Sequence, residues 1–201
     1  MESDTYKTIE VPAEGLYKEK GSKFLSFLYH VETEDEVKQL IEKLRKEYHD
    51  ARHHCYAYIL GTEKQTYRAN DDGEPSGTAG RPIHGQLLSF EVTNVLLVVV
   101  RYFGGVLLGA SGLANAYKIA AREALSAATI IERTIDVRYE LQFRYEQIND
   151  VMKILKDNAI TPKKQKFDME CSIEFAVRKM NSERILKAFE NLRTVQINEI
   201  K

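Results

Sequence analysis

The sequence contains little cysteine and no long apolar run. Its two cysteines, Cys55 and Cys171, are far apart and form no C-x-x-C pair, so we interpret them as core residues of a reduced, intracellular protein. The longest apolar run, Val95 to Val100, is much shorter than the roughly 20 residues that a membrane-spanning helix needs. The acidic N-terminus also lacks the apolar stretch of a secretory signal. These absences predict a cytoplasmic protein without membrane contact.

The chain has no strong excess of charge of either sign. Its formal net charge is −1 at pH 7. Residues 1–130 carry 15 basic and 18 acidic side chains, a net charge of −3, whereas residues 131–201 carry 14 and 12, a net charge of +2. This balance argues against a uniformly basic nucleic-acid coat. We interpret the locally basic cluster of Lys163, Lys164 and Lys166 as a solvated loop.

The pattern of apolar residues predicts alternating strands and helices in the first 130 residues. Hydrophobic residues make up 43% of the 201 positions and charged residues 29%, a composition typical of globular domains. Thr33-x-x-Glu36 is a capping box, which marks the start of an amphipathic helix. The expected strands span residues 23–31, 54–60, 65–69 and 95–103, and the expected helices lie within 37–48, 80–90 and 111–128.

The remainder of the chain predicts a second, smaller domain. Strands are expected at 135–145, 160–167, 170–177 and from 195 onward, with helices around 148–155 and 185–192. Asn181 or Ser182 is expected to cap the second of these helices. The order β-α-β-β-α-β is that of the ferredoxin-like plan. We therefore predict an α+β protein with one domain at 1–130 and another at 131–201.

A polar, glycine-rich loop at residues 70–82 holds more functional groups than a connector needs. A tight turn requires only Asp72-Gly73, because these residue types accept the left-handed backbone conformation. Functional residues often gather on loops that rigid elements hold in place. The candidate ligand- or partner-binding residues in this loop are Asn70, Asp71, Asp72, Glu74, Ser76, Gly77, Thr78 and Arg81. The alternative is a long polar surface loop in which the glycines provide flexibility.

A second glycine-rich loop, at residues 101–112, connects the buried strand to a helix. Ser111 is expected to cap this helix, whose unpaired N–H groups attract anions. Glycines allow backbone N–H groups to approach a phosphate or carboxylate closely, and Arg101 adds a planar, bidentate cation. The candidate binding residues here are Arg101, Tyr102, Gly104, Gly105, Gly109 and Ser111. The alternative is a tight strand-to-helix turn packed against a neighbouring segment.

Five side chains are candidates for acid–base chemistry, namely Asp71, Asp72, Glu74, His53 and His54. Strand alternation sends the two histidines to opposite faces, so no metal site shared by both is predicted; the alternative is that one of them faces the acidic cluster in an acid–base or metal site. If the protein is an enzyme, a carboxylate would act as general base or magnesium ligand and a histidine as general acid. If it is not an enzyme, no cofactor is expected. The alternative for each histidine is a structural, hydrogen-bonded role. Walker A, G-x-G-x-x-G and G-x-S-x-G motifs are absent.

The two loops carry long motifs that resemble those of a known family. N-D-D-G-E-P-S-G-T-A-G at 70–80 and V-V-V-R-Y-F-G-G-V-L-L-G-A-S-G-L at 98–113 resemble the signature of the IMPACT/YigZ family. The resemblance implies a first domain with the left-handed β-α-β arrangement shared by a small-subunit ribosomal protein domain and the GHMP kinases. It implies a ferredoxin-like second domain similar to those of elongation factor G. It also implies a link to translation, because eukaryotic relatives are associated with translational control.

Three functions are compatible with these patterns. The first, which we favour, is a translation-linked binding protein that contacts RNA, the ribosome or a translation factor through the loops at 70–82 and 101–112, without DNA specificity. The second is an enzyme that acts on a small phosphorylated or carboxylated molecule held by the glycine-rich loop. The third is a protein–protein adaptor that displays exposed aromatic side chains. The sequence leaves the oligomeric state open.

Overall fold

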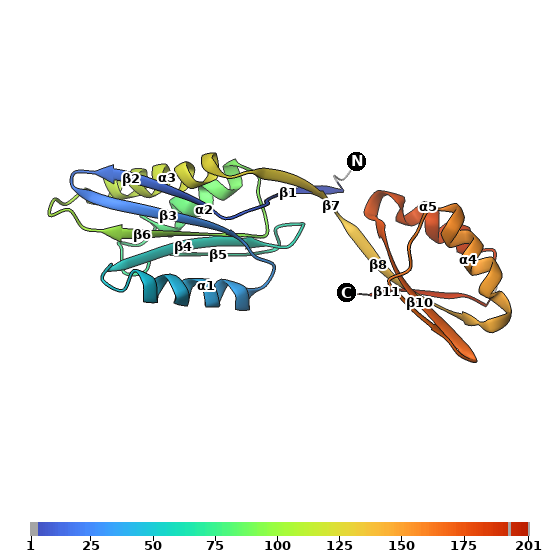
Figure 1. Ribbon diagram of the computed structural model, residues 1–201. Helices are drawn as coiled ribbons and strands as arrows, with labels where there is room; N and C mark the ends of the chain where they lie inside the picture. Colours follow the sequence, from blue (N-terminus) through green and yellow to red (C-terminus); the bar gives the residue numbers. More distant parts are fainter. Residues whose placement is uncertain (1–3, 193, 201) are drawn as a thin grey trace. The chain divides into compact units, whose positions relative to one another are not determined.

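The computed structural model describes residues 4–192 and 194–200, which form two compact units (Figure 1). The first unit comprises Tyr6–Arg133, and the second comprises the chain from Thr134 onward together with Asp4 and Thr5. Each unit has its own hydrophobic core. Among the helices of the described ranges, none is both long enough and apolar enough to cross a membrane.

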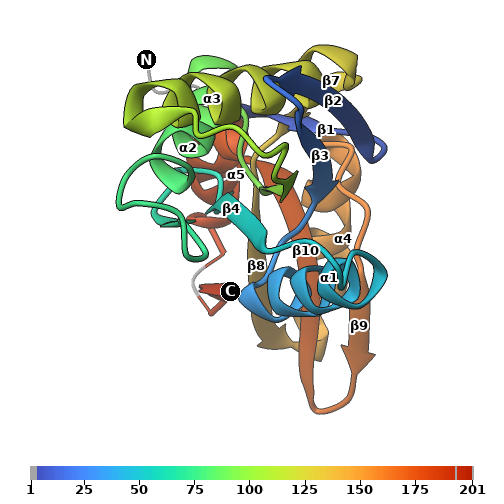
Figure 2. The ribbon, with the colours of Figure 1, turned by 90° about the vertical axis from the view of Figure 1, so that its left-hand side faces the viewer.

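The first unit is built on a five-stranded antiparallel sheet with the order β2-β3-β6-β4-β5. The strands of this sheet are β2 (Ala13–Glu19), β3 (Ser22–His30), β4 (His53–Leu60), β5 (Thr66–Asn70) and β6 (Val95–Tyr102). Two further strands, β1 (Thr5–Ile9) and β7 (Ile130–Thr134), lie outside it. The helices of the unit are α1 (Glu34–Glu47), α2 (Gly80–Ser89) and α3 (Gly109–Ala127). Figure 2 shows α1 on one side of the sheet and α2 with α3 on the other.

The central strand β6 explains the one continuous apolar run of the sequence. Val95, Leu97 and Val99 pack into the core beneath α2 and α3, whereas Leu96 and Val98 pack into the core beneath α1. Because helices cover both faces, successive side chains on this strand are all apolar. The buried strand predicted at this position is confirmed.

Helix α1 begins where its local sequence predicts. The Thr33 hydroxyl accepts a hydrogen bond from the Glu36 backbone N–H, and the Glu36 carboxylate accepts one from the Thr33 N–H, both at 3.2 Å. This reciprocal arrangement satisfies N–H groups that the first turn of a helix leaves unpaired. The predicted capping box is therefore confirmed.

The second unit has a four-stranded antiparallel sheet with the order β11-β8-β10-β9. Its elements are β8 (Asp136–Arg144), the short 3₁₀ helix η1 (Tyr145–Gln147), α4 (Ile148–Asp157), β9 (Lys164–Phe167), β10 (Glu170–Arg178), α5 (Lys179–Phe189) and β11 (Gln196–Ile200). The sequence order is thus β-α-β-β-α-β, as the ferredoxin-like plan requires. The predicted α+β class is confirmed for both units.

Several local predictions are wrong. Helix α5 begins at Lys179 after Arg178, so neither Asn181 nor Ser182 caps it, and the Ser182 hydroxyl donates to the Lys179 carbonyl within the first turn at 2.7 Å. Strand β9 begins at Lys164 instead of residue 160, and Ala159, which follows α4, has a left-handed φ of 54°. The strands β1, β2 and β7 were not predicted. Strands β1 and β7 pair as a separate two-stranded sheet.

Candidate functional site

The loop at 70–82 folds around the carboxylate of Asp71. This carboxylate accepts hydrogen bonds from the backbone N–H groups of Gly77 (2.8 Å), Ala79 (2.9 Å) and Gly80 (2.8 Å). Burial acts to raise the pKa of Asp71, but these three bonds outweigh it and hold the pKa below its usual value. Ala79 gives α2 no side-chain cap, so Asp71 supplies the negative charge at that helix N-terminus.

Asp72 connects the same loop to the α1 side of the sheet. One oxygen of its carboxylate accepts from Arg45 Nη2 and the other from the His54 backbone N–H, each at 2.6 Å. Its own N–H donates to the Asn70 side chain at 2.8 Å. Asp72 and Gly73 have φ values of 42° and 86°, which confirms the predicted left-handed turn. Asn70 and Asp72 therefore hold the loop in shape.

Glu74 joins the two glycine-rich loops within the protein interior. Its side chain is only 4% exposed, and Oε1 accepts hydrogen bonds from Arg101 Nη1 (2.6 Å) and the Tyr117 hydroxyl (2.8 Å). Burial raises the pKa of Tyr117, so this hydroxyl stays protonated and available as a donor. Cys55 Sγ lies 3.3 Å from the Tyr117 oxygen, and burial raises the pKa of its thiol. Cys55 is buried, as predicted, and Tyr117 is buried beside it, but both belong to a polar network.

Arg101 is the centre of this interior network. Its guanidinium carbon lies 5.5 Å from the centroid of the Phe24 ring and 5.7 Å from that of Phe103. The Ser22 hydroxyl lies 3.5 Å from Arg101 Nη2 and accepts from the Gly104 N–H at 3.1 Å. Arg101 is 6% exposed, so in this conformation its guanidinium faces Glu74 and aromatic rings and not an external anion.

Gly104 is required by a close contact between backbones. A Cβ atom at this position would lie 1.9 Å from the carbonyl carbon of Gly21 and 2.1 Å from the nitrogen of Ser22. The turn between β2 and β3 therefore packs directly against the start of the 101–112 loop. Gly105 and Gly109 have φ values of 86° and 71°, which favour glycine for conformational reasons.

The two histidines of β4 face opposite sides of the sheet, as predicted. His53 Nδ1 donates to the Asp72 carbonyl at 2.9 Å, and its Nε2 lies 4.0 Å from the Glu74 carboxylate. The His53 side chain is 22% exposed, so it forms the solvent-facing edge of the network. His54 is buried beside α1, and this burial lowers its pKa. In residues 4–192 and 194–200, no group of three or more His, Cys, Asp and Glu side chains is arranged to hold a metal ion.

The other predicted site residues divide into internal and external ones. The Thr78 hydroxyl donates to the Pro75 carbonyl at 2.6 Å, and the Tyr102 hydroxyl donates to Asp50 at 2.7 Å. The bond to Asp50 raises the pKa of Tyr102 to about 12. The residues that face solvent are Ser76, Gly77, Arg81, Gly105, Gly109 and Ser111. The predicted cap at Ser111 is wrong, because α3 begins at Gly109, and Leu108 at its N-cap makes no side-chain bond.

Two exposed features lie outside the list of candidate binding residues. The rings of Tyr67 and His84 stack with centroids 4.9 Å apart and an interplanar angle of 24°, and Tyr67 is 64% exposed. Arg81 lies on α2 three residues before His84, so it belongs to the same side of that helix. The 101–112 loop also exposes Phe103, Leu107 and neighbouring apolar groups. The sequence shows that Arg81 and His84 are spaced to share one side of a helix. It does not show that Tyr67 on β5 stacks on His84.

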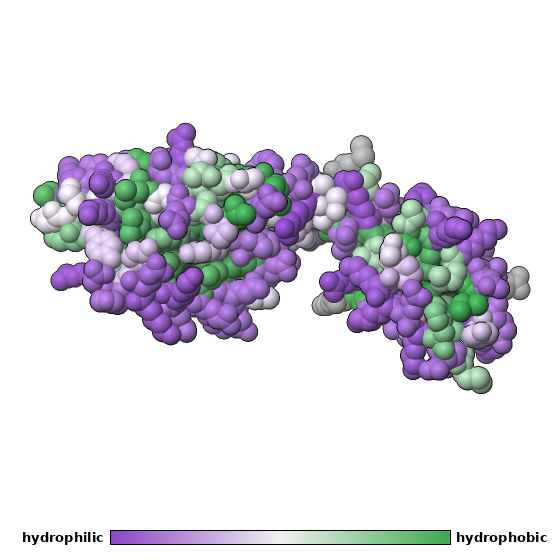
Figure 3. Space-filling view, viewed as in Figure 1, coloured by the Kyte–Doolittle hydropathy of each residue, from purple (hydrophilic) through white to green (hydrophobic). Residues whose placement is uncertain are grey.

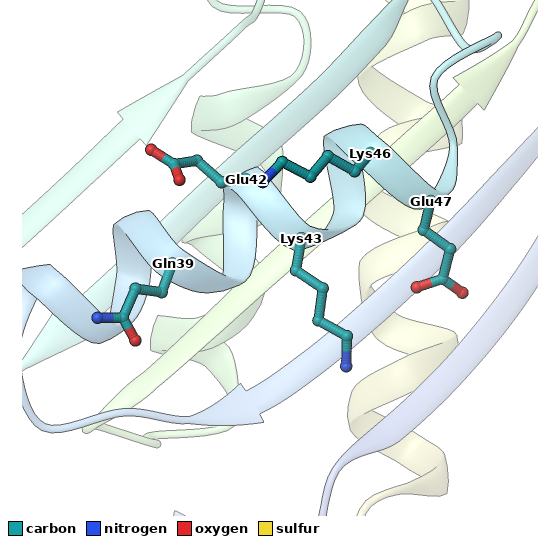
Figure 4. A pocket seen from close by; sticks show the side chains of 5 residues that line it. All are labelled: Gln39, Glu42, Lys43, Lys46 and Glu47. Carbon is teal, nitrogen blue, oxygen red and sulfur yellow. The ribbon is translucent and has the colours of Figure 1, made fainter.

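A shallow polar hollow on α1 lies apart from these features. Its lining comes from one helix only and consists of Gln39, Glu42, Lys43, Lys46 and Glu47 (Figure 4). Figure 4 shows Lys43 and Glu47 extending to one side of the helix while Glu42 lies on the other. None of the predicted site residues lines this hollow, so we place the candidate site at the two glycine-rich loops.

Comparison with known proteins places the chain in a family. The model of the Impact N-terminal domain matches residues 20–125. The chain is 40% identical to the Escherichia coli protein named IMPACT family member YigZ over 138 residues, 68% of each chain. It is 32% identical to an IMPACT family member from Haemophilus influenzae over 177 residues, 86% of this chain and 82% of that one. The crystal structure of a hypothetical protein matches 99% of this chain and 98% of its own, with a TM-score of 0.76 and 29% identity. The chain therefore belongs to the Impact family.

Proposed function

We propose that this chain is a translation-linked binding protein of the Impact family that contacts RNA, the ribosome or a translation factor. The main structural support is that Glu74 accepts hydrogen bonds from both Arg101 and Tyr117, which joins the two glycine-rich loops into one structure. A surface fixed in this way loses little conformational entropy when a partner binds. The link to translation rests on the family resemblance, because eukaryotic relatives are associated with translational control.

The outward-facing side of the first loop supplies groups that suit such a partner. The exposed ring of Tyr67, which stacks on the half-buried ring of His84, offers a face on which an unpaired base can stack. Arg81 is exposed beside them and can pair with a phosphate in two hydrogen bonds. Ser76 and Gly77 are exposed in the middle of the loop, where a hydroxyl and backbone polar groups face solvent. This surface comes from β5, the 70–82 loop and α2.

The enzymatic alternative is supported less well by the geometry. Asp71 already accepts three backbone N–H bonds, Asp72 pairs with Arg45, and Glu74 is buried against Arg101. A magnesium ion would have to displace these partners, which bind the same carboxylate oxygens. His53 is partly exposed, but its Nδ1 donates to the Asp72 carbonyl and its Nε2 lies 4.0 Å from the Glu74 carboxylate. We therefore favour binding and propose a cytoplasmic protein that works without a cofactor.

Ribosome co-sedimentation from native lysate tests the proposal. We expect the wild-type protein to sediment with ribosomes and a Tyr67→Ala, Arg81→Ala double variant to lose about tenfold or more in affinity, since stacking alone contributes about 1–3 kcal/mol per base. Arg122→Ala is the matched control, because Arg122 is an exposed arginine on α3. Arg101 is left intact because its replacement would disturb the interior network.

The two outcomes have distinct meanings. If binding weakens steeply with added salt and only the double variant is impaired, the loop surface contacts nucleic-acid phosphates. If the wild-type protein does not sediment with ribosomes, RNA or translation factors, the proposal is wrong. A thermal-shift screen of phosphorylated metabolites with and without magnesium would then test the enzymatic alternative through the same Tyr67 and Arg81 variants and a His53→Ala variant.

A further inference from the structure

On one face of the sheet in the first unit, the β2 edge is left without a covering helix. Strand alternation places Leu16, Leu25 and Val100 in one row across β2, β3 and β6 on the α1 side. Burial falls along this row, because Val100 is fully buried, Leu25 is half-buried and Leu16 is 50% exposed. Helix α1 therefore covers the centre of the sheet but not its β2 edge.

The uncovered area is a groove with an apolar floor. It is lined by Leu16, Lys18, Gly21, Lys23, Leu25, Tyr102 and Phe103. The 101–112 loop extends its apolar surface, since Val106 is 51% and Leu107 is 85% exposed. Figure 3 shows hydrophobic residues in green at the end of the first unit that carries this loop. Exposed apolar surface of this kind, flanked by charged groups, marks an interaction site.

The groove is held in shape from beneath. The Arg101 guanidinium lies 5.7 Å from the Phe103 ring centroid, and Gly104 packs against the backbone of Gly21. The Tyr102 hydroxyl is fixed by its bond to Asp50. Because these contacts exist without any partner, the groove does not have to be formed during binding, and the entropy cost of binding is reduced.

The two charged residues that line the groove are both lysines. Lys18 on β2 lies directly opposite Lys23 on β3, which lies opposite Tyr102 on β6. Both lysines are exposed, and neither forms an ion pair within the described part of the chain. Like charges directly opposite each other on neighbouring strands destabilise a sheet, so folding alone does not account for this pair. Carboxylates of a partner placed above both lysines would relieve the repulsion.

We propose that this groove binds an acidic, apolar segment of a partner protein, with Leu or Phe side chains on its floor and Asp or Glu side chains at Lys18 and Lys23. A protein segment fits better than RNA, because the groove together with the adjoining 101–112 loop presents more aliphatic than aromatic side chains, and the nearby arginine, Arg101, is buried against Glu74. This surface lies on the α1 side of the sheet, whereas Tyr67 and His84 lie on the α2 side, so the inference does not depend on the function proposed above.

A peptide titration followed by NMR tests the proposal on the full chain. The probe is a short synthetic peptide that alternates Leu or Phe with Asp or Glu, and its control is the same peptide with Lys in place of every acid. We expect only the acidic peptide to bind, with amide shifts concentrated at residues 16–25 and 102–107. The Lys18→Glu, Lys23→Glu variant should weaken binding about tenfold. Lys153→Glu, Lys156→Glu is the matched control, because both lysines are exposed on α4.

Several outcomes would overturn the inference. Equal binding of the acidic and basic peptides, or shifts that map outside the groove, would show that the lysines do not select the partner. Absence of binding by the acidic peptide would remove the proposed occupant. Displacement of the peptide by single-stranded oligouridine would assign the groove to RNA, and a concentration-dependent dimer that the Leu16→Asp variant abolishes would assign it to a second copy of the chain.

Discussion

The two units of this protein differ most in what their cores contain. The first unit buries Thr8, Ser22, Ser26, His54, Glu74, Thr78, Gln86, Thr93, Asn94 and Arg101. Among the described residues of the second unit, by contrast, the buried side chains are aliphatic, aromatic or cysteine. Burying a polar group is unfavourable unless a partner satisfies it. Some of these polar groups satisfy the backbone elsewhere in the unit, but the buried ion pair of Glu74 and Arg101 lies where the two glycine-rich loops meet.

The contrast is sharpest for two ion pairs of the same chemical type. Arg101 and Glu74 meet at 2.6 Å with 6% and 4% of their side chains exposed, whereas Lys164 and Glu174 meet at 3.1 Å with 76% and 31% exposed. Glu74→Ala should destabilise the first unit by about 3–5 kcal/mol, because it leaves the Arg101 charge buried without a partner. Glu174→Ala should cost about 0–1 kcal/mol, because water solvates the remaining lysine.

Residue-resolved hydrogen exchange measures both effects separately, since each unit reports its own opening free energy. The variant Glu74→Gln refines the comparison, because it retains the shape and one acceptor oxygen but removes the charge. The opening free energy of the first unit in this variant should lie between those of the wild type and Glu74→Ala. Similar losses for Glu74→Ala and Glu174→Ala would mean that the interior network contributes no more than a surface pair, and the contrast between the units would be wrong.

A glycine comparison gives the next largest effect. Gly104→Ala should destabilise the first unit by about 1–3 kcal/mol or more, because the new methyl group would overlap the backbone of Gly21. Gly85→Ala, inside α2, meets no atom within 4 Å and should instead stabilise that helix by up to about 1 kcal/mol. Chemical denaturation of both variants checks the opposite signs. A neutral Gly104→Ala would show that the β2–β3 turn yields easily and that the groove is not preformed.

Sequence reasoning succeeded where the determinants are local. The capping box at Thr33 and the left-handed turn at Asp72 depend on residues a few positions apart, and both are confirmed. The buried strand β6 was also recognisable, because a short, continuous apolar run rich in valine is typical of a strand that is covered on both faces. Strand β2 was missed because it lies at a sheet edge, where Lys18 and Leu16 face outward and the expected alternation is weak.

The sequence indicates the two loops as the candidate site, but it does not indicate the roles of their residues. Asp71 and Arg101 were expected to offer charges to a ligand, whereas each is occupied by partners within the protein. The Glu74–Arg101 bond links residues 27 positions apart, and no periodic pattern in the sequence indicates such a contact. The same limit applies to Tyr67 and His84, whose stacking requires β5 and α2 to be adjacent.

The pH dependence of the first unit should reflect Asp71. Its pKa in the folded protein is lowered, so its contribution to stability is fully present above the unfolded value of about 4 and is lost as the pH falls through the lowered pKa. Asp71→Asn should remove this part of the acid sensitivity, which hydrogen exchange or urea unfolding between pH 5 and pH 2 would measure. An unchanged pH profile would mean that the three N–H bonds do not favour the ionised carboxylate.

The smallest expected effect concerns the two lysines of the groove. Lys23→Glu should stabilise the first unit by about 0.2–1 kcal/mol, because it converts a pair of like charges on β2 and β3 into an opposite-charge pair. Lys18→Glu should have the same effect. The double variant again places like charges opposite each other, so its stability should equal that of the wild type. Urea unfolding of the four proteins forms a double-mutant cycle that isolates the interaction. If Lys23→Glu raises stability while it weakens binding of the acidic peptide, the lysine pair serves recognition at the expense of the fold. If neither single variant is more stable than wild type, the lysines do not repel each other, and the groove loses its electrostatic argument.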